Sequence, residues 1–131
     1  MSSDAVTIES PDKRKRTILE YIGEARFGPA FFLGSSSGFD WPLGETPVGE
    51  DAHWSANSRF VVVLMFRSQD TATSPDVELV AIDTEEQKII SIDRNAHGLI
   101  YQCGFVDSGD YEYRFMDHGK ATTRRWRPPS P

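Results

Sequence analysis

The sequence lacks the features typical of secreted and membrane proteins. Its single cysteine, Cys103, cannot form an internal disulfide. No apolar run approaches the roughly 18 residues that a membrane-spanning helix needs. Residues 1–10 lack the positively charged start and the apolar segment of a secretory signal. We therefore predict a cytoplasmic protein that does not bind a membrane.

Metal-binding patterns are also missing. The three histidines show none of the spacings of zinc sites, and one cysteine is too few for a structural zinc site. Cys103 lies in an apolar segment, which is typical of a buried small hydrophobe, although a nucleophile paired with His97 or His118 stays open. These observations predict no metal ligand and no cofactor.

Only one segment is similar to a catalytic motif. Residues 34–38, GSSSG, match the G-x-S-x-G pattern that holds the nucleophile of serine hydrolases. That turn needs a strand before it and a helix after it, and the Trp41-Pro42 pair argues against the helix. We predict a flexible surface loop at 34–38 and no catalytic residue.

The charge is negative overall and unevenly distributed. The net charge is −6, but residues 40–117 carry fifteen aspartates and glutamates against five lysines and arginines. Basic residues gather near the two ends, in 13–16 and 120–127. An acidic body repels nucleic acid and attracts cationic partners. We predict a basic protein partner and no nucleic-acid binding; the alternative is that the carboxylates only keep a β-rich surface soluble.

Segment 53–67 organises the chain. A polar turn at 55–58 is followed by seven apolar residues at 60–66, three of them valine and two phenylalanine. This composition favours a strand, and the unbroken apolar run predicts burial on both faces. We therefore place residues 60–66 at the centre of a sheet.

Shorter segments with β-strand patterns surround this strand. They predict an all-β fold, an antiparallel meander of about eight strands that forms a sandwich or half-barrel. A short N-terminal helix over 13–25 is the alternative to a hairpin there, and an open sheet edge would allow a homodimer. The expected strands are 6–9, 16–22, 30–33, 60–66, 77–82, 88–92, 99–106 and 111–115.

Other segments are expected to be irregular. Residues 1–119 form one β domain, and the basic, proline-rich residues 120–131 form a tail with little regular structure. Residues 39–51 contain two prolines, and 68–75 are polar, so both are expected to be loops. The longer loop, 39–51, is the better candidate for function.

Two turn segments of similar sequence lie 45 positions apart. They are SPDKR at 10–14 and SANSR at 55–59, and VDSGD at 106–110 is a degenerate third copy. Residues 53–92 resemble a β-propeller blade of the WD40 or TolB-like kind, in which such a turn leads into an apolar strand. The segment departs from that pattern by having Ala56 where proline is usual and by lacking the Trp-Asp dipeptide. The resemblance implies blade-like pairing, although the chain is too short for a closed propeller of about 40–45 residues per blade.

Acidic and aromatic side chains gather in the 39–51 loop and around residue 110. Two tryptophans flank the acidic loop: Trp54 is expected in the core, whereas Trp41 fits either the core or a surface anchor. The predicted partner-binding residues are Asp40, Trp41, Glu45, Glu50, Asp51, Asp107, Asp110 and Tyr111.

Three functions fit this sequence. The first expectation is a small non-catalytic protein of the bacterial immunity type, which sequesters a cationic toxin or effector through its acidic surface. The second is a small-molecule-binding protein or enzyme with its site near the 34–51 loop, where His53 and Asp51 are the residues to test. The third is an interaction module in a larger assembly.

Overall fold

The computed structural model describes residues 5–24, 30–67, 76–96 and 99–129. Every regular element in these residues is a β-strand, which confirms the predicted all-β class. The elements are β1 (Ala5–Glu9), β2 (Arg16–Glu24), β3 (Ala30–Ser37), β4 (Val48–Trp54), β5 (Phe60–Phe66), β6 (Val77–Asp83), β7 (Lys88–Asn95), β8 (Leu99–Phe105), β9 (Tyr111–Asp117) and β10 (Lys120–Trp126).

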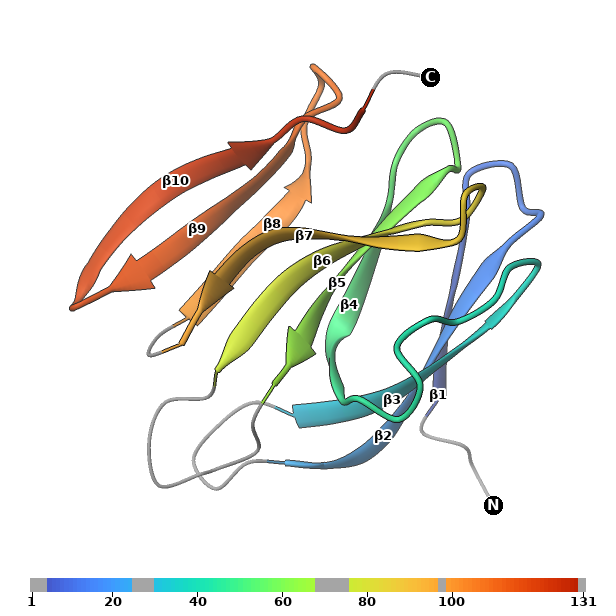
Figure 1. The fold of residues 1–131 in the computed structure, drawn as a ribbon, viewed down its shortest axis with the longest axis horizontal. Helices are drawn as coiled ribbons and strands as arrows, with labels where there is room; N and C mark the ends of the chain where they lie inside the picture. Colours follow the sequence, from blue (N-terminus) through green and yellow to red (C-terminus); the bar gives the residue numbers. More distant parts are fainter. Residues whose placement is uncertain (1–4, 25–29, 68–75, 97–98, 130–131) are drawn as a thin grey trace.

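The strands form two antiparallel sheets. Strands β1 to β7 pair in chain order to make one seven-stranded sheet, and β8 to β10 make a three-stranded sheet. Strands β3 and β4 are joined through a single residue pair, Phe32 with Val48, whereas β5 and β6 pair along their whole length. This narrow connection lets the N-terminal strands turn away from the rest, so that β4–β7 lie between β8–β10 and β1–β3 (Figure 1).

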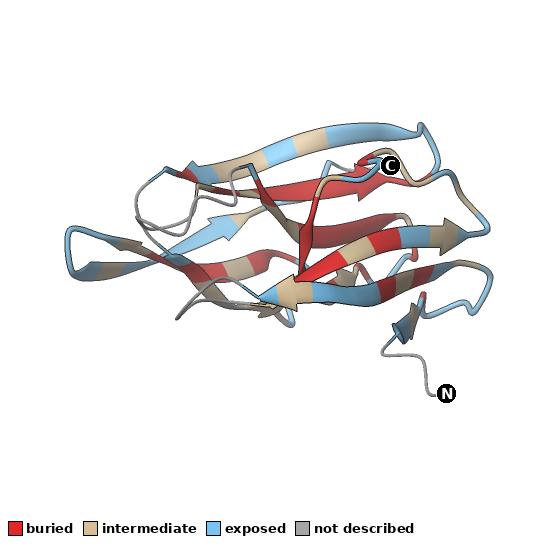
Figure 2. Cartoon of the chain, turned by 90° about the horizontal axis from the view of Figure 1, so that it is seen from below, coloured by how far each residue is buried: buried red, intermediate tan, exposed pale blue. Residues whose placement is uncertain are grey.

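Strand β5 is buried on both faces, as its unbroken apolar run predicts. Val62 and Phe66 belong to the core that faces β8–β10, and Val61 and Val63 belong to the core that faces β2 and β3. All four are at most 3% exposed, and burying such a side chain contributes about 1.5–3 kcal/mol. Buried residues accordingly concentrate in the strands between the outer layers (Figure 2).

The resemblance to a propeller blade is wrong. Residues 53–92 are not a separate four-stranded blade, because β4 continues into β3 and the meander runs on to β1. Within the described residues, neither sheet is closed or propeller-like. The turn at 55–58 is instead ordinary hairpin chemistry, in which Ser and Asn side chains hydrogen-bond to the local backbone.

The matching turns at 10–14 and 55–59 nevertheless share one hydrogen-bond pattern. In each, the N–H of the first serine donates to the carbonyl five residues on, and its hydroxyl donates to the side chain two residues on. The fourth residue, Lys13 or Ser58, has a φ of 62°. The turn at 106–110 keeps the bond from the fourth N–H to the first carbonyl, but it closes one residue earlier.

The N-terminal hairpin is confirmed, and the alternative helix is wrong. Strands β1 and β2 pair from Ala5 with Glu20 to Glu9 with Arg16. The β-branched residues of this segment favour the strand, and Ser10 stabilises the turn through its own hydroxyl rather than capping a helix.

The expected loop at 34–38 is also wrong, because 34–37 complete β3. Gly34 is buried, and a Cβ atom at this position would overlap the indole ring of Trp41. Trp41 therefore packs over the strand, which explains why glycine stands inside it. The irregular segment is 38–47, shorter than the expected 39–51, since residues 48–51 belong to β4. The expected loop at 68–75 lies outside the described residues.

The expected irregular tail is wrong over most of its length. Residues 120–126 form β10, which pairs with β9 from Lys120 opposite Asp117 to Trp126 opposite Tyr111. Residues 120–126 show no apolar alternation because β10 is an edge strand with mostly exposed side chains. Its arginines pair with body carboxylates, Arg124 with Asp93 and Arg125 with Glu112.

A buried ion pair links the start of β5 to the end of β6. Arg59 donates two hydrogen bonds to the Asp83 carboxylate, of 3.1 and 2.9 Å, and the Asp83 side chain is only 1% exposed. The same carboxylate accepts the backbone N–H groups of Glu85 and Glu86 at the β6–β7 turn. Asp83 thus holds both a strand pair and a turn.

The N-terminal hairpin docks on this end of the sheet through Lys15. Its ammonium donates to the Thr84 hydroxyl at 2.7 Å and to the Ser58 carbonyl at 3.0 Å. One lysine of the 13–16 cluster is therefore used inside the fold rather than on a binding surface.

We predict that replacing Asp83 by asparagine lowers the free energy of unfolding and makes it depend less on pH in the acid range. Burial raises the pKa of Asp83, but the hydrogen bonds from Arg59 and from the Glu85 and Glu86 backbone outweigh it and lower the pKa to about 2. A depressed folded-state pKa stabilises the protein above the unfolded pKa of about 4, and this contribution of about 2 kcal/mol is lost as the pH falls toward 2. Asp83→Asn should lower the free energy of unfolding by about 3 kcal/mol at pH 7.

Urea unfolding between pH 7 and pH 2.5 checks this expectation. The wild-type protein should lose stability over the acid range more steeply than Asp83→Asn does. Equal slopes in the two proteins would show that the ion pair does not control acid stability.

Candidate functional site

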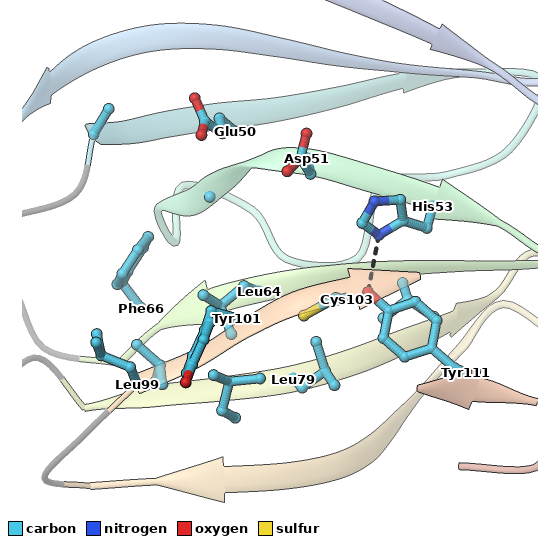
Figure 3. A pocket seen from close by; sticks show the side chains of 15 residues that line it. Glu50, Asp51, His53, Leu64, Phe66, Leu79, Leu99, Tyr101, Cys103 and Tyr111 are labelled. Carbon is cyan, nitrogen blue, oxygen red and sulfur yellow. Dashed lines mark hydrogen bonds between the residues drawn. The ribbon is translucent and has the colours of Figure 1, made fainter. Parts of the chain in front are cut away.

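A cavity of about 400 Å³ lies between the central strands and β8 (Figure 3). Its walls come from β3 to β6 on one side and from β8 and the start of β9 on the other. The volume falls in the range of about 300–1,000 Å³ typical of small-molecule sites. Apolar side chains make most of the wall, among them Val62, Leu64, Phe66, Val77, Leu79 and Ile100.

Two irregularities in strand pairing meet at this cavity. Between Val48 and Ala52, strand β4 has two residues more than the stretch of β5 it faces, and between Tyr101 and Gly104, strand β8 has one more than β9. Such bulges change where side chains point and occur frequently beside binding sites. Here they lie at Glu50 and Asp51 of β4 and at Cys103 of β8, all of which line the cavity.

The inner end of the cavity is polar. The Nδ1 atom of His53 lies 2.8 Å from the hydroxyl of Tyr111, and the two groups share a hydrogen bond. The Cys103 thiol lies beside the same hydroxyl. Tyr111 is 1% exposed and His53 is half-buried, so this end is shielded from solvent.

Burial controls the protonation of these three groups. It lowers the pKa of His53, an effect that the negative charge of Asp51 partly offsets. It raises the pKa of the Cys103 thiol and of the Tyr111 hydroxyl, and Asp51 adds to both shifts. Near neutral pH the inner end therefore presents a neutral imidazole, a thiol and a phenol, which bind by hydrogen bonding rather than by charge.

Of the two pairings that the sequence left open for a Cys103 nucleophile, the one with His118 is not assembled. The polar neighbours of Cys103 are Tyr111 and, through it, His53, whereas His118 is exposed and contacts Asp117. His97 lies outside the described residues. A raised thiol pKa also reduces the thiolate fraction that nucleophilic attack requires. The cavity is consequently better suited to binding than to thiol chemistry.

The cavity meets solvent on the side of Glu50, Asp51 and Leu99. Both carboxylates are exposed, and Leu99 is 48% exposed. Glu50 and Asp51 are the charged residues among those that line the cavity. The mouth therefore carries negative charge, and the walls behind it are apolar.

The predicted partner-binding residues are distributed over several places. Glu50, Asp51 and Tyr111 come together at the cavity, although Tyr111 is buried and cannot contact a protein partner. Asp110 is also buried and pairs with Arg127. Trp41 packs over Gly34, which places it nearer the core than the surface-anchor hypothesis requires. Five members are exposed and form no ion pair with another described residue, namely Asp40, Glu45, Glu50, Asp51 and Asp107.

Sequence reasoning placed a small-molecule site near residues 34–51 and missed most of its walls. Only 49–51 of that range line the cavity, whereas Leu64, Leu79 and Tyr101 come from strands assigned to the core. An apolar residue that faces a cavity has the same strand pattern as one that faces another side chain. The available signal was His53, a histidine at the start of the segment that organises the sheet.

Neither a metal-holding cluster nor a membrane-spanning helix occurs in the described residues. Within the described ranges, no group of three or more His, Cys, Asp or Glu side chains is arranged to hold a metal ion. Those ranges also contain no helix with the length and apolar character needed to cross a membrane.

We predict that Asp51→Asn lowers the pKa of His53 further below 6.5. The Asp51 carboxylate raises this pKa, against the larger lowering effect of burial, so its removal leaves burial less opposed. An NMR titration of the imidazole measures the change, with Asp107→Asn as the control because that carboxylate does not act on His53. An unchanged or higher His53 pKa in Asp51→Asn would contradict the prediction.

Comparisons with known proteins assign no relative. No protein-family model, no curated protein and no solved structure matches the chain. The cavity and its residues are therefore the basis for assigning a function.

Proposed function

We propose that the protein binds a small, largely apolar molecule in the cavity between β4–β6 and β8. The observation that carries this proposal is a cavity of about 400 Å³ with apolar walls and a hydrogen-bonded polar inner end. Small-molecule sites combine these two features, since apolar walls provide affinity and a few polar groups fix orientation.

The cavity is formed by departures from regular packing. Protein interiors are close-packed, and an unfilled apolar space loses contacts that its lining atoms would otherwise make. Leu64, Leu79 and Ile100 face this space from three different strands. A ligand with an apolar body would restore those contacts, which gives binding its driving force.

The polar end supports binding rather than catalysis. The Tyr111 hydroxyl is already engaged by His53, and Cys103 lies beside it, so the hydroxyl and the imidazole position each other. A ligand group that reaches this end meets neutral hydrogen-bonding partners. The proposal therefore names a binding protein and assigns no reaction to it.

We predict that filling the cavity removes ligand binding. The probe is N-phenyl-1-naphthylamine, a neutral compound whose fluorescence rises in apolar surroundings. The wild-type protein should bind it with saturation at one molecule per chain. Leu64→Trp places a large ring in the cavity and should weaken binding at least about tenfold, because each 1.4 kcal/mol lost is a factor of ten.

The matched control adds the same ring elsewhere. Ile22 on β2 is 49% exposed and does not line the cavity, so Ile22→Trp should bind the probe as the wild-type protein does. Circular dichroism verifies that both variants are folded. Equal binding by the two tryptophan variants would show that the probe does not occupy the cavity.

Sequestration of a cationic protein is a second proposal, as an immunity-type inhibitor acting in the cytoplasm. It is favoured by the five exposed carboxylates that lack an ion-pair partner among the described residues, three of which lie in 45–51. Other body carboxylates are already neutralised by arginines, as Asp93 and Glu112 are. The acidic surface available to a partner is therefore narrower than the composition implies.

We predict that reversing the charge of Glu45, Glu50 and Asp51 together slows association with such a partner and flattens its salt dependence. Long-range attraction between opposite charges accelerates encounter and is screened by salt. Surface plasmon resonance with a basic protein captured from the native lysate measures both effects. Unchanged association rates would remove this segment from the binding surface.

A further inference from the structure

We propose that the cavity selects an amphipathic amine, with an apolar body between the sheets and a single ammonium head at the mouth beside Glu50 and Asp51. This inference rests on the proposed binding function and adds the chemical class of the ligand.

The charges on the described residues that line the cavity have one sign. Glu50 and Asp51 are its charged lining residues, and neither forms an ion pair with another described residue. A ligand carboxylate or phosphate would approach two like charges, and the lining residues that the structure describes include no lysine or arginine to offset them. An ammonium group is attracted by the same two carboxylates.

The backbone places both carboxylates at one mouth. Neighbouring residues of a regular strand point to opposite faces of the sheet, so Glu50 and Asp51 would normally be separated. In β4 they lie within the stretch between Val48 and Ala52 that carries two residues more than the facing part of β5. Figure 3 shows both side chains on the same side of the cavity. The irregular pairing of β4 therefore creates a two-carboxylate mouth that a regular strand would not have.

The electrostatic effect of the Asp51 carboxylate also reaches the inner end of the cavity. Burial is the main cause of the raised pKa values of Cys103 and Tyr111, and the charge of Asp51 raises both further. A second anion in this space would be opposed by the same field, whereas a neutral body is not. Charge at the mouth and apolar character inside together match a molecule with one cationic end.

The walls define the other end of the ligand. Leu64 and Leu79 face the interior from the large sheet, and Ile100 faces it from β8. An aliphatic chain or an aromatic ring fits between these side chains, and its burial supplies most of the affinity. The ammonium remains near solvent, where it does not lose its hydration fully.

The test compares three competitors that share one body. They are 4-phenylbutylamine, 4-phenylbutan-1-ol and 4-phenylbutanoate, each used to displace N-phenyl-1-naphthylamine from the wild-type protein at pH 7. The amine is protonated at this pH because primary amines have a pKa of about 10. We expect the amine to bind roughly two- to fivefold more tightly than the alcohol, as is typical of exposed ion pairs, and the carboxylate to bind more weakly than the alcohol.

Two double variants identify the groups responsible. Glu50→Gln with Asp51→Asn should bring the ratio of amine to alcohol affinity to about one. Glu45→Gln with Asp107→Asn removes two carboxylates that do not line the cavity and should retain the wild-type ratio. Raising the salt concentration to about 1 M should reduce the preference in the wild-type protein.

The outcomes separate this inference from the proposed function. If the probe binds and Leu64→Trp weakens its binding as expected, but the amine is not preferred, the amine inference is wrong and the cavity remains a ligand site. A preference that persists in Glu50→Gln with Asp51→Asn also overturns the inference. If the probe does not bind at all, both proposals fail. Dimerisation that excludes the probe, seen by light scattering, would assign the cavity to a second copy of the chain and overturn both.

Discussion

The fold depends on the burial of β5 from both sides. A strand with seven consecutive apolar residues cannot leave either face in water, so it needs one layer of protein on each side. The three-stranded sheet supplies the first layer, and β1–β3 with the 38–47 segment supply the second. The narrow junction between β3 and β4 makes this arrangement possible, because a uniformly paired sheet could not turn far enough to cover its own face. The long meander is thus divided into layers because both faces of β5 must be buried.

The cavity lies where the three-stranded sheet does not pack fully against the central strands. Strands β4 and β8 face each other with extra residues in each, and the side chains between them leave a space rather than a packed core. The same irregularities bring Glu50, Asp51 and Cys103 to the lining. Regular strands would have sent alternate members of these segments elsewhere. A packing defect and a set of polar groups therefore have one structural cause, which favours a binding role over accidental emptiness.

The polar turns show how local chemistry can repeat without a repeated fold. The turns at 10–14 and 55–59 form the same hydrogen bonds, yet one ends a peripheral hairpin and the other leads into the central strand. Their shared requirement is a serine that bonds to the backbone and a fourth residue in the left-handed conformation. Similarity at this level predicts a tight turn correctly. It does not predict a propeller, because a blade is defined by where its sheet stops, and this sheet continues.

The sequence by itself determined the elements whose side chains carry a strong pattern. The apolar run at 60–66, the hairpin of β6 and β7 and the alternation in β9 are read directly from residue type, because burial on one or two faces selects those residues. Only the tertiary structure decided the rest. Strand β10 is an exposed edge strand, and its arginines form ion pairs with carboxylates of β7 and β9. Glycine stands at position 34 inside β3 because the Trp41 ring occupies the space that a side chain would need. The apolar walls of the cavity have no signature in the sequence, since Leu64 and Leu79 face it with the same pattern they would show in a filled core. Whether an apolar side chain meets another side chain or an open space depends on the distance between two sheets, and residues far apart in the chain set that distance.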